Sequence, residues 1–224
     1  MNRYLARSGL ASRRKSEEII LSGRVKINGK TIKDLSTNID IKNDSVIVDG
    51  KLIKIHDHKY YLLNKPTGYT CTRKDRFAKK TVFDLLPKDD SLFTVGRLDK
   101  ETSGLILITN DGDFAQNIIH PKFKVPKKYI AELENDVKSE DIKHLLTGVK
   151  LEDGPAKAIS AKTINPREIE VTIEEGRNRI VRRMIRGTGN KVLGLKRISV
   201  GNIKIDIKEG EFRELTEKEI AQYA

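Results

Sequence analysis

Several residue types are scarce in this chain of 224 residues, and their scarcity excludes whole classes of protein. Cys71 is the only cysteine, so an intrachain disulfide framework is excluded. No apolar run is long enough to span a membrane, and the segment Met1–Tyr4 lacks the apolar core of a secretory signal. Tryptophan is absent and aromatic residues make up only 5% of the chain, so an aromatic residue inside a motif is informative. We therefore expect a soluble, cytoplasmic protein.

Residues that bind metals are also few. The four histidines, His56, His58, His120 and His144, are scattered, and no cysteine or further histidine stands at ligand spacing from the first two. We therefore expect no metal site, and we interpret residues 55–59 as a polar linker. The chain also lacks a Walker sequence, which excludes the usual phosphate-binding loop of nucleotide hydrolases.

Positive charge is abundant. The chain has 44 basic and 32 acidic residues, a net charge of +12. Residues 1–33 hold nine lysines and arginines against two glutamates, so +7 of this charge lies at the N-terminal end of the sequence. Such a cluster favours a polyanionic partner, because neutralised phosphates release their counterions. The alternative is an ordinary basic surface that only keeps the protein in solution.

The most informative stretch is 96–112. Arg97 and Asp99 stand in a loop that runs into Thr-Ser-Gly, and the apolar run Leu105–Ile108 then ends at Asn-Asp-Gly. This short run is bounded by turn residues and predicts a buried strand. Asp99 is thereby expected at the rim of a sheet beside a cation, where a carboxylate can act as a nucleophile or a base. A surface ion pair is the ordinary alternative for such an aspartate.

The pattern Arg-Leu-Asp-x-x-Thr-Ser-Gly-Leu at residues 97–105 resembles the signature of the pseudouridine synthases. This resemblance implies that Asp99 is the catalytic nucleophile. The segment Asn64-Lys65-Pro66-Thr67-Gly68 is similar to the first motif of the same family and has the form of a rigid turn. The resemblance implies that Lys65 and Pro66 support the loop that holds Asp99 and take no part in the chemistry.

Two further motifs follow the same family. Residues 127–133 alternate as a strand does and contain a Lys-x-Tyr pattern, with Lys127 and Tyr129. From the residues alone a strand tyrosine is most often a core residue. The resemblance implies that Tyr129 stacks on the target uracil and helps to remove its C5 proton.

The segment 174–185 is similar to the third family motif, and its apolar spacing predicts a helix that glycines at 187 and 189 end. The resemblance implies that Arg182 pairs with Asp99, and such a cation would keep the carboxylate ionised. Arg177 and Arg179 are expected either to bind RNA or to lie on a solvated helix face. Ile180 departs from the glutamine that is frequent at this position.

The first segment predicts two helices followed by strands. Gly9 ends a short helix, and Ser12 is expected to cap a second helix that runs to Leu21. Asn28-Gly29 then predicts a tight hairpin turn, and residues 45–51 predict another strand and turn. Residues 8–14 and 23–30 resemble the two halves of the S4 RNA-binding domain, which implies binding of structured RNA through its phosphates. The alternative is a solvated basic helix.

The residues expected to contact RNA are basic and come from all of these motifs. They are Arg3, Arg7, Arg13, Arg14, Lys15, Arg24, Lys26, Lys30, Arg97, Arg177 and Arg179.

Nearly the whole chain resembles the ribosomal pseudouridine synthases of the RsuA type. The expected fold is α+β, with an S4 domain at 1–54, the linker at 55–59 and a catalytic domain at 60–224 built on a mixed, mainly antiparallel sheet flanked by helices. Three segments, Cys71–Asp75, His120-Pro121 and Leu151–Pro155, resemble the members that modify the large ribosomal subunit. A capping box at Thr216 predicts a terminal helix.

The implied reaction is isomerisation of uridine to pseudouridine in 23S rRNA by a monomer that needs no cofactor. Attack of Asp99 at C1′, attack at C6 and a glycal path all remain open. The alternatives are a synthase that acts on 16S rRNA or tRNA, and a non-enzymatic S4 protein that only binds RNA.

Overall fold

A computed structural model describes residues 1–73 and 79–223. It divides into two compact units. The first unit consists of residues 1–59 together with 88–93 and 109–111, and the second consists of 60–87, 94–108 and 112–224. Lys74 and Asp75, which belong to one of the large-subunit segments, lie outside the described residues.

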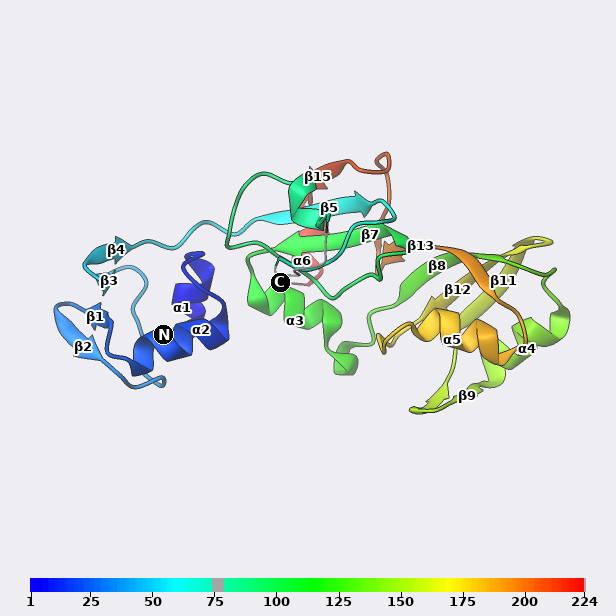
Figure 1. Cartoon of the computed structure of the whole chain (residues 1–224), viewed down its shortest axis with the longest axis horizontal. Coiled ribbons are helices and arrows are strands. Elements are labelled where there is room, and N and C mark those ends of the chain that lie inside the picture. Colours follow the sequence, from blue (N-terminus) through cyan, green and yellow to red (C-terminus); the bar gives the residue numbers. More distant parts are fainter. Residues whose placement is uncertain (74–78, 224) are drawn as a thin grey trace. The chain divides into compact units, whose positions relative to one another are not determined.

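The first unit contains two helices and a small antiparallel sheet (Figure 1). The helices are confirmed where the sequence predicts them, as α1 (Asn2–Arg7) and α2 (Arg13–Leu21). The Ser12 side chain caps α2 by accepting a hydrogen bond from the backbone amide of Lys15 at 3.4 Å. Its sheet has the order β2-β1-β3-β4 and contains β1 (Val25–Ile27), β2 (Lys30–Ile32), β3 (Val46–Val48) and β4 (Lys51–Ile53).

Both predicted turns are present in this sheet. Asn28 and Gly29 have φ values of 49° and 84°, and Asp49 and Gly50 have values of 49° and 79°. Two successive residues with positive φ match the right-handed twist of the flanking strands, and Asn, Asp and Gly tolerate this conformation best. The register Ile27↔Lys30 confirms the two-residue turn at 28–29.

The second unit is built on a large mixed sheet with the strand order β11-β12-β8-β13-β7-β5-β15. β13 pairs with β7 in parallel, and the other pairs with a determined register are antiparallel. This arrangement confirms the predicted α+β fold. The strands of the sheet are β5 (Tyr60–Lys65), β6 (Phe93–Thr94), β7 (Thr102–Thr109), β8 (Lys127–Leu133), β11 (Ser160–Asn165), β12 (Glu168–Ile173), β13 (Val192–Val200), β14 (Ile203–Lys204) and β15 (Phe212–Glu214).

Helices and one hairpin surround this sheet. Figure 1 shows α3 alongside β7, and α4 and α5 alongside the part formed by β8, β12 and β11. A separate hairpin of β9 (Val149–Leu151) and β10 (Gly154–Ala156) was not predicted. The helices are η1 (Val82–Leu85), α3 (Gly112–Ile119), η2 (Pro121–Phe123), α4 (Ser139–Thr147), α5 (Ile180–Gly187) and α6 (Glu217–Ala221).

The core contains β7 along its whole length. All eight of its residues are buried, and Leu105 and Leu107 pack with Phe114 and Ile118 of α3. Gly104 has a φ of 104°, and a Cβ there would lie 2.2 Å from the carbonyl oxygen of Arg197 on β13. Only glycine therefore fits where these two parallel strands come together.

Candidate active site

A buried lysine, Lys65, holds the loop that carries Asp99 through hydrogen bonds to the backbone. Lys65 is fully buried, and its Nζ donates to the carbonyl oxygens of Thr102 at 2.7 Å, Pro66 at 2.8 Å and Lys100 at 3.4 Å. Burial is the main cause that lowers the pKa of Lys65, and nearby acidic groups act in the opposite direction. Because all three acceptors are backbone carbonyls, Lys65 fixes the path of the chain on both sides of the loop and leaves no proton donor free for substrate.

Further hydrogen bonds close the loop itself. The amide of Thr102 donates to the carbonyl oxygen of Asp99 at 3.0 Å, and the amide of Gly68 donates to that of Lys100 at 2.8 Å. The amide of Leu98 donates to the Cys71 sulfur at 3.4 Å, and burial raises the pKa of this thiol. The loop is thus tied to the turn at 64–68, which the sequence assigned to a supporting part.

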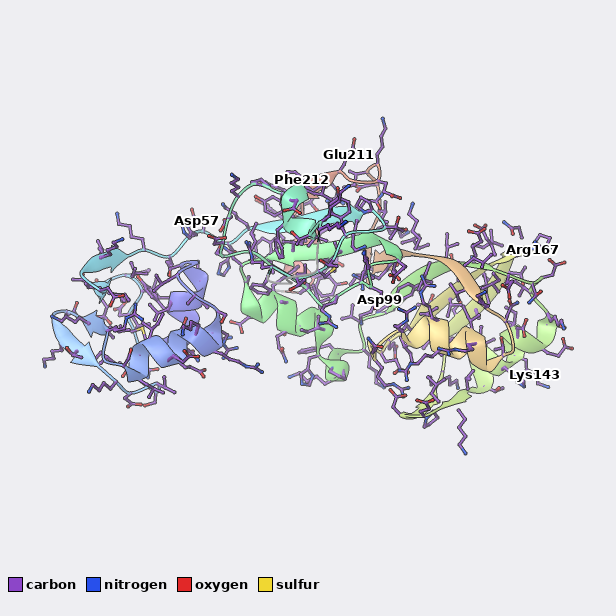
Figure 2. All side chains as sticks on the ribbon, in the orientation of Figure 1. Asp57, Asp99, Lys143, Arg167, Glu211 and Phe212 are labelled. Atoms are coloured by element: carbon purple, nitrogen blue, oxygen red, sulfur yellow. The ribbon has the colours of Figure 1, made fainter. Side chains whose placement is uncertain are left out.

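A cavity of about 350 Å³ opens beside this loop. Its walls come from the Asp99 loop, the start of β8, the segment 176–181 and β13. It falls within the range of about 300–1,000 Å³ that is typical of small-molecule sites. Figure 2 labels Asp99 in the middle of the second unit, close to β7.

Asp99 and Tyr129 both line this cavity. Asp99 is half-buried, and among the described residues its carboxylate has no ion pair or hydrogen bond. Tyr129 is 8% exposed because odd-numbered residues of β8 face the core, and its hydroxyl has no hydrogen-bond partner in the described part of the chain. A free carboxylate and an unpartnered phenol beside one cavity are both available to a ligand.

Arg182 contacts the Asp99 loop through the backbone. Its guanidinium donates to the carbonyl oxygens of Glu101 and Val192, each at 3.2 Å, and its Nε is buried without a partner among the described residues. Within those residues no ion pair under 4.0 Å joins Arg182 to Asp99, so the direct pair implied by the resemblance is not formed in this structure. Burial lowers the pKa of Arg182, and the charge of Arg179 lowers it further. Asp99 and Glu101 act to raise it, so Arg182 lies within electrostatic reach of the loop.

Two buried cations also line the cavity, and sequence reasoning gave neither a role. Lys127 is 9% exposed and donates to the carbonyl oxygen of Val125 at 2.9 Å. Arg197 on β13 is 4% exposed, and its Nε donates to the carbonyl oxygen of Leu105 at 2.7 Å. Burial is the main cause that lowers the pKa of Lys127 to about 8, and the charge of Arg197 adds to the effect. The only sequence signal for Arg197 is a charged residue within an alternating strand.

Arg177 lines the cavity but is engaged by the protein itself. Its guanidinium pairs with Glu175 and with Asp153, at 2.5 Å and 2.9 Å, and also donates to the carbonyl oxygens of Gly154 and Pro155. Arg183 donates to both carboxylate oxygens of Asp153 at 2.8 and 2.9 Å. These arginines join the β9–β10 hairpin to the third motif, so Arg177 is held in place by protein acceptors. Their charges and hydrogen bonds lower the pKa of Asp153.

The remaining residues expected to contact RNA differ in their exposure and in their contacts with the protein. Arg97 is exposed at the cavity. A guanidinium nitrogen of Arg179 lies 3.8 Å from a carboxylate oxygen of Glu101. In the first unit Arg24 pairs with Asp49, Lys15 pairs with Glu18 at 2.5 Å, and Arg7 donates to the carbonyl oxygen of His56 at 3.2 Å. The exposed residues of this set are Arg3, Arg13, Arg14, Lys26 and Lys30.

The segment 59–186 matches the family model described as RNA pseudouridylate synthase, and residues 2–46 match the S4 domain. The chain belongs to the RNA pseudouridylate synthase family. It is therefore an enzyme that isomerises uridine in RNA, and it carries an RNA-binding S4 domain at its N-terminus.

Relatives match this synthase along nearly its whole length. An uncharacterized RNA pseudouridine synthase of Aquifex aeolicus is 40% identical, over 99% of this chain and 92% of the relative. The ribosomal large subunit pseudouridine synthase B of Bacillus subtilis is 36% identical, over 98% and 93%. A crystal structure of a pseudouridylate synthase superposes with a TM-score of 0.73 at 31% identity and covers 100% of this chain and 98% of the other.

The described residues lack two further features. No helix in residues 1–73 or 79–223 is long and apolar enough to cross a membrane. Over the same ranges no group of three or more histidine, cysteine, aspartate or glutamate residues is arranged to hold a metal ion.

Proposed function

We propose that this synthase converts uridine to pseudouridine in 23S rRNA and that Asp99 is its nucleophile. The observation that carries this proposal is the position of the Asp99 carboxylate, which lines a cavity together with Tyr129 and has no partner among the described residues. A nucleophile must be free to reach the reacting carbon, and a carboxylate already committed to an ion pair is less able to do so.

In the proposed reaction the target uridine first leaves its base stack and enters the cavity. Extrusion of a paired or stacked base costs a few kcal/mol. Arg97 is exposed at the cavity wall, and its planar guanidinium suits the gap that the base leaves in the stack. The ring of Tyr129 offers an apolar face on which the uracil can stack.

The chemistry then exchanges one bond to the ribose for another. The N1–C1′ bond breaks while Asp99 acts as the nucleophile, the uracil turns within the cavity, C5 bonds to C1′, and Asp99 leaves again as a free carboxylate. C5 loses its proton and N1 gains one, so atoms and electrons balance without a redox partner. The free hydroxyl of Tyr129 is in the cavity where it can accept or relay the C5 proton.

Arg182 has a supporting part in this proposal. Its two hydrogen bonds join Glu101, two residues after Asp99, to Val192 at the start of β13. The guanidinium therefore holds the loop and supplies positive charge near the carboxylate of Asp99. A direct Asp99–Arg182 ion pair would need a movement of one of the two side chains.

The choice of 23S rRNA rests on the relatives. The Bacillus subtilis relative is named for the large subunit, and 98% of this chain aligns with it. The exposed arginines and lysines of α2 and the β1–β2 hairpin would bind folded RNA through its phosphates. In this proposal the enzyme acts as a monomer on its ribosomal substrate in the cytoplasm.

The test maps pseudouridine in total RNA from cells with and without the gene. We expect one or a few uridines of 23S rRNA to lose the modification and to regain it when the gene is restored. Loss confined to 16S rRNA or to tRNA would contradict the choice of substrate. Unchanged maps, together with purified protein that converts no uridine in rRNA, would contradict the proposed function.

A further inference from the structure

Lys127 and Arg197 form a pair of buried cations beside one cavity. Arg197 stands opposite Tyr129 on the neighbouring strand, and Lys127 precedes Tyr129 by two residues on the same face of β8. Lys127 donates to the carbonyl oxygen of Val125, and Arg197 donates to that of Leu105. Within the described residues neither has a carboxylate closer than 4.0 Å, and Glu174 acts on Lys127 only at longer range.

Buried cations without a counter-ion are costly and uncommon. Removing a charge from water costs several kcal/mol, so buried charges are normally paired. Arg177 follows that rule by binding Glu175 and Asp153, and Arg213 follows it by binding Glu219 and Asp206. Lys65 is buried without a carboxylate, but three backbone carbonyls accept its N–H groups, whereas Lys127 and Arg197 each donate to only one carbonyl. The charge of Arg197 also lowers the pKa of Lys127. Two cations left together at a cavity wall indicate that an anion from outside the chain completes the site.

The substrate supplies one kind of anion. Uracil and ribose are neutral, so in RNA the charge that can meet these side chains is a backbone phosphate. An arginine whose Nε is fixed by Leu105 still presents its terminal nitrogens, and arginine with lysine is a common combination for phosphate oxygens. We propose that Lys127 and Arg197 bind a backbone phosphate next to the target uridine. This inference rests on the proposed RNA substrate of the same cavity.

The experiment uses the full-length protein and an rRNA fragment of about 30 nucleotides around a uridine that it converts. Each phosphate flanking that uridine is replaced in turn by a neutral methylphosphonate. For the wild type we expect one replacement to raise KM by about tenfold and to change kcat by less than about threefold, because the neutral group loses a charge-assisted contact and tenfold corresponds to about 1.4 kcal/mol.

The variant Lys127→Met then shows whether that contact is made by this lysine. With unmodified RNA we expect its KM to rise by about tenfold and the slope of log affinity against log salt to fall by about one. With the sensitive methylphosphonate RNA we expect no further rise, because the contact is already lost. Lys128→Met is the matched control, since the adjacent Lys128 faces away from the cavity and pairs with Glu170 at 3.0 Å.

Several outcomes would overturn the inference. One is a wild type that tolerates every methylphosphonate, a result that does not depend on the folding of any variant. Another is a further rise of about tenfold in the KM of Lys127→Met when the RNA carries the sensitive methylphosphonate. A fall in kcat at constant KM would also overturn it, since it would indicate that Lys127 acts on Asp99 or the uracil. The proposed function fails separately, if the wild type converts no uridine in rRNA at all.

Discussion

Replacement of the buried cation Lys127 by methionine should stabilise the protein while it weakens the enzyme. The pKa of Lys127 falls from 10.5 to about 8, chiefly because the side chain is buried. At 1.36 kcal/mol for each pKa unit, that fall corresponds to about 3 kcal/mol of destabilisation at neutral pH. Methionine fills a similar volume without charge, but it leaves the Val125 carbonyl without its donor at a cost of about 1 kcal/mol. The expected net gain in the free energy of unfolding is about 1–3 kcal/mol at pH 7.

The pH dependence gives this prediction its sign. Between pH 8 and 10.5 the unfolded chain keeps the Lys127 proton while the folded chain has lost it, so the unfolded state binds more protons. Wild-type stability should therefore rise across this window as far as this lysine is concerned, and the advantage of Lys127→Met should disappear. The advantage should be complete below pH 8, where the lysine is charged in both states.

Urea unfolding followed by circular dichroism at pH 7, 8.5 and 10 measures both effects. Lys128→Met again serves as the control, because its exposed pair with Glu170 is worth at most about 1 kcal/mol and its loss should not stabilise the protein. If Lys127→Met is destabilised at pH 7, or its difference from the wild type does not shrink towards pH 10, the account of a buried unpaired cation is wrong.

Three further outcomes are expected. Glu219→Gln should lower the free energy of unfolding by about 1–2 kcal/mol at pH 7, because hydrogen bonds from Arg213 hold the pKa of Glu219 at about 2. This stabilisation is present above pH 4.5 and is lost as the pH falls towards 2, so acid unfolding curves of variant and wild type should converge there. Tyr129→Phe keeps the stacking ring, so it should lower kcat by about 10²-fold with little change in KM, and an unchanged kcat would limit Tyr129 to stacking. Arg13→Glu with Arg14→Glu should reduce the salt slope of rRNA binding by about two or more, whereas an unchanged slope would show that α2 does not contact phosphates.

Local signals predicted much of the fold. Ser12 and Thr216 cap helices because their side chains satisfy backbone amides three residues on, an interaction that depends on neighbouring sequence alone. The turn at Asn28-Gly29 depends on the backbone preferences of those two residues. The strand Leu105–Ile108 is likewise recognisable from its apolar run, although the structure extends it to residues 102–109.

Contacts between residues far apart in the sequence could not be predicted from such local signals. The network of Asp153 with Arg177 and Arg183 joins residues 24 and 30 positions apart, and nothing near Asp153 in the sequence identifies its partners. Arg197 enters the cavity because β13 lies between β8 and β7, an order that the sequence does not contain. The position of Arg182 relative to Asp99 depends on side-chain directions, which a motif does not specify.

The residues that make up the first compact unit also could not be predicted from local sequence. Residues 88–93 and 109–111 are grouped with residues 1–59 in the first unit. Asn110, for example, donates to the carbonyl oxygen of Asp57 at 2.9 Å and accepts from the amide of Lys59 at 2.8 Å. Such contacts bring together segments that are about fifty positions apart, and composition or linker signals around residue 55 cannot reveal them.

Release of tritium from C5 of uridine tests the central claim most directly, because the C5 proton leaves only when the isomerisation proceeds. Purified wild type, Asp99→Asn and the control Asp136→Asn are compared on 5-tritiated rRNA, since Asp136 is 69% exposed and pairs only with Arg167 in the described residues. We expect Asp99→Asn to release no tritium while its RNA affinity stays within a few fold of wild type, because an amide cannot replace a carboxylate nucleophile. The control should release tritium at the wild-type rate. Release by Asp99→Asn at a rate near that of the wild type would contradict the assignment of Asp99 as the nucleophile.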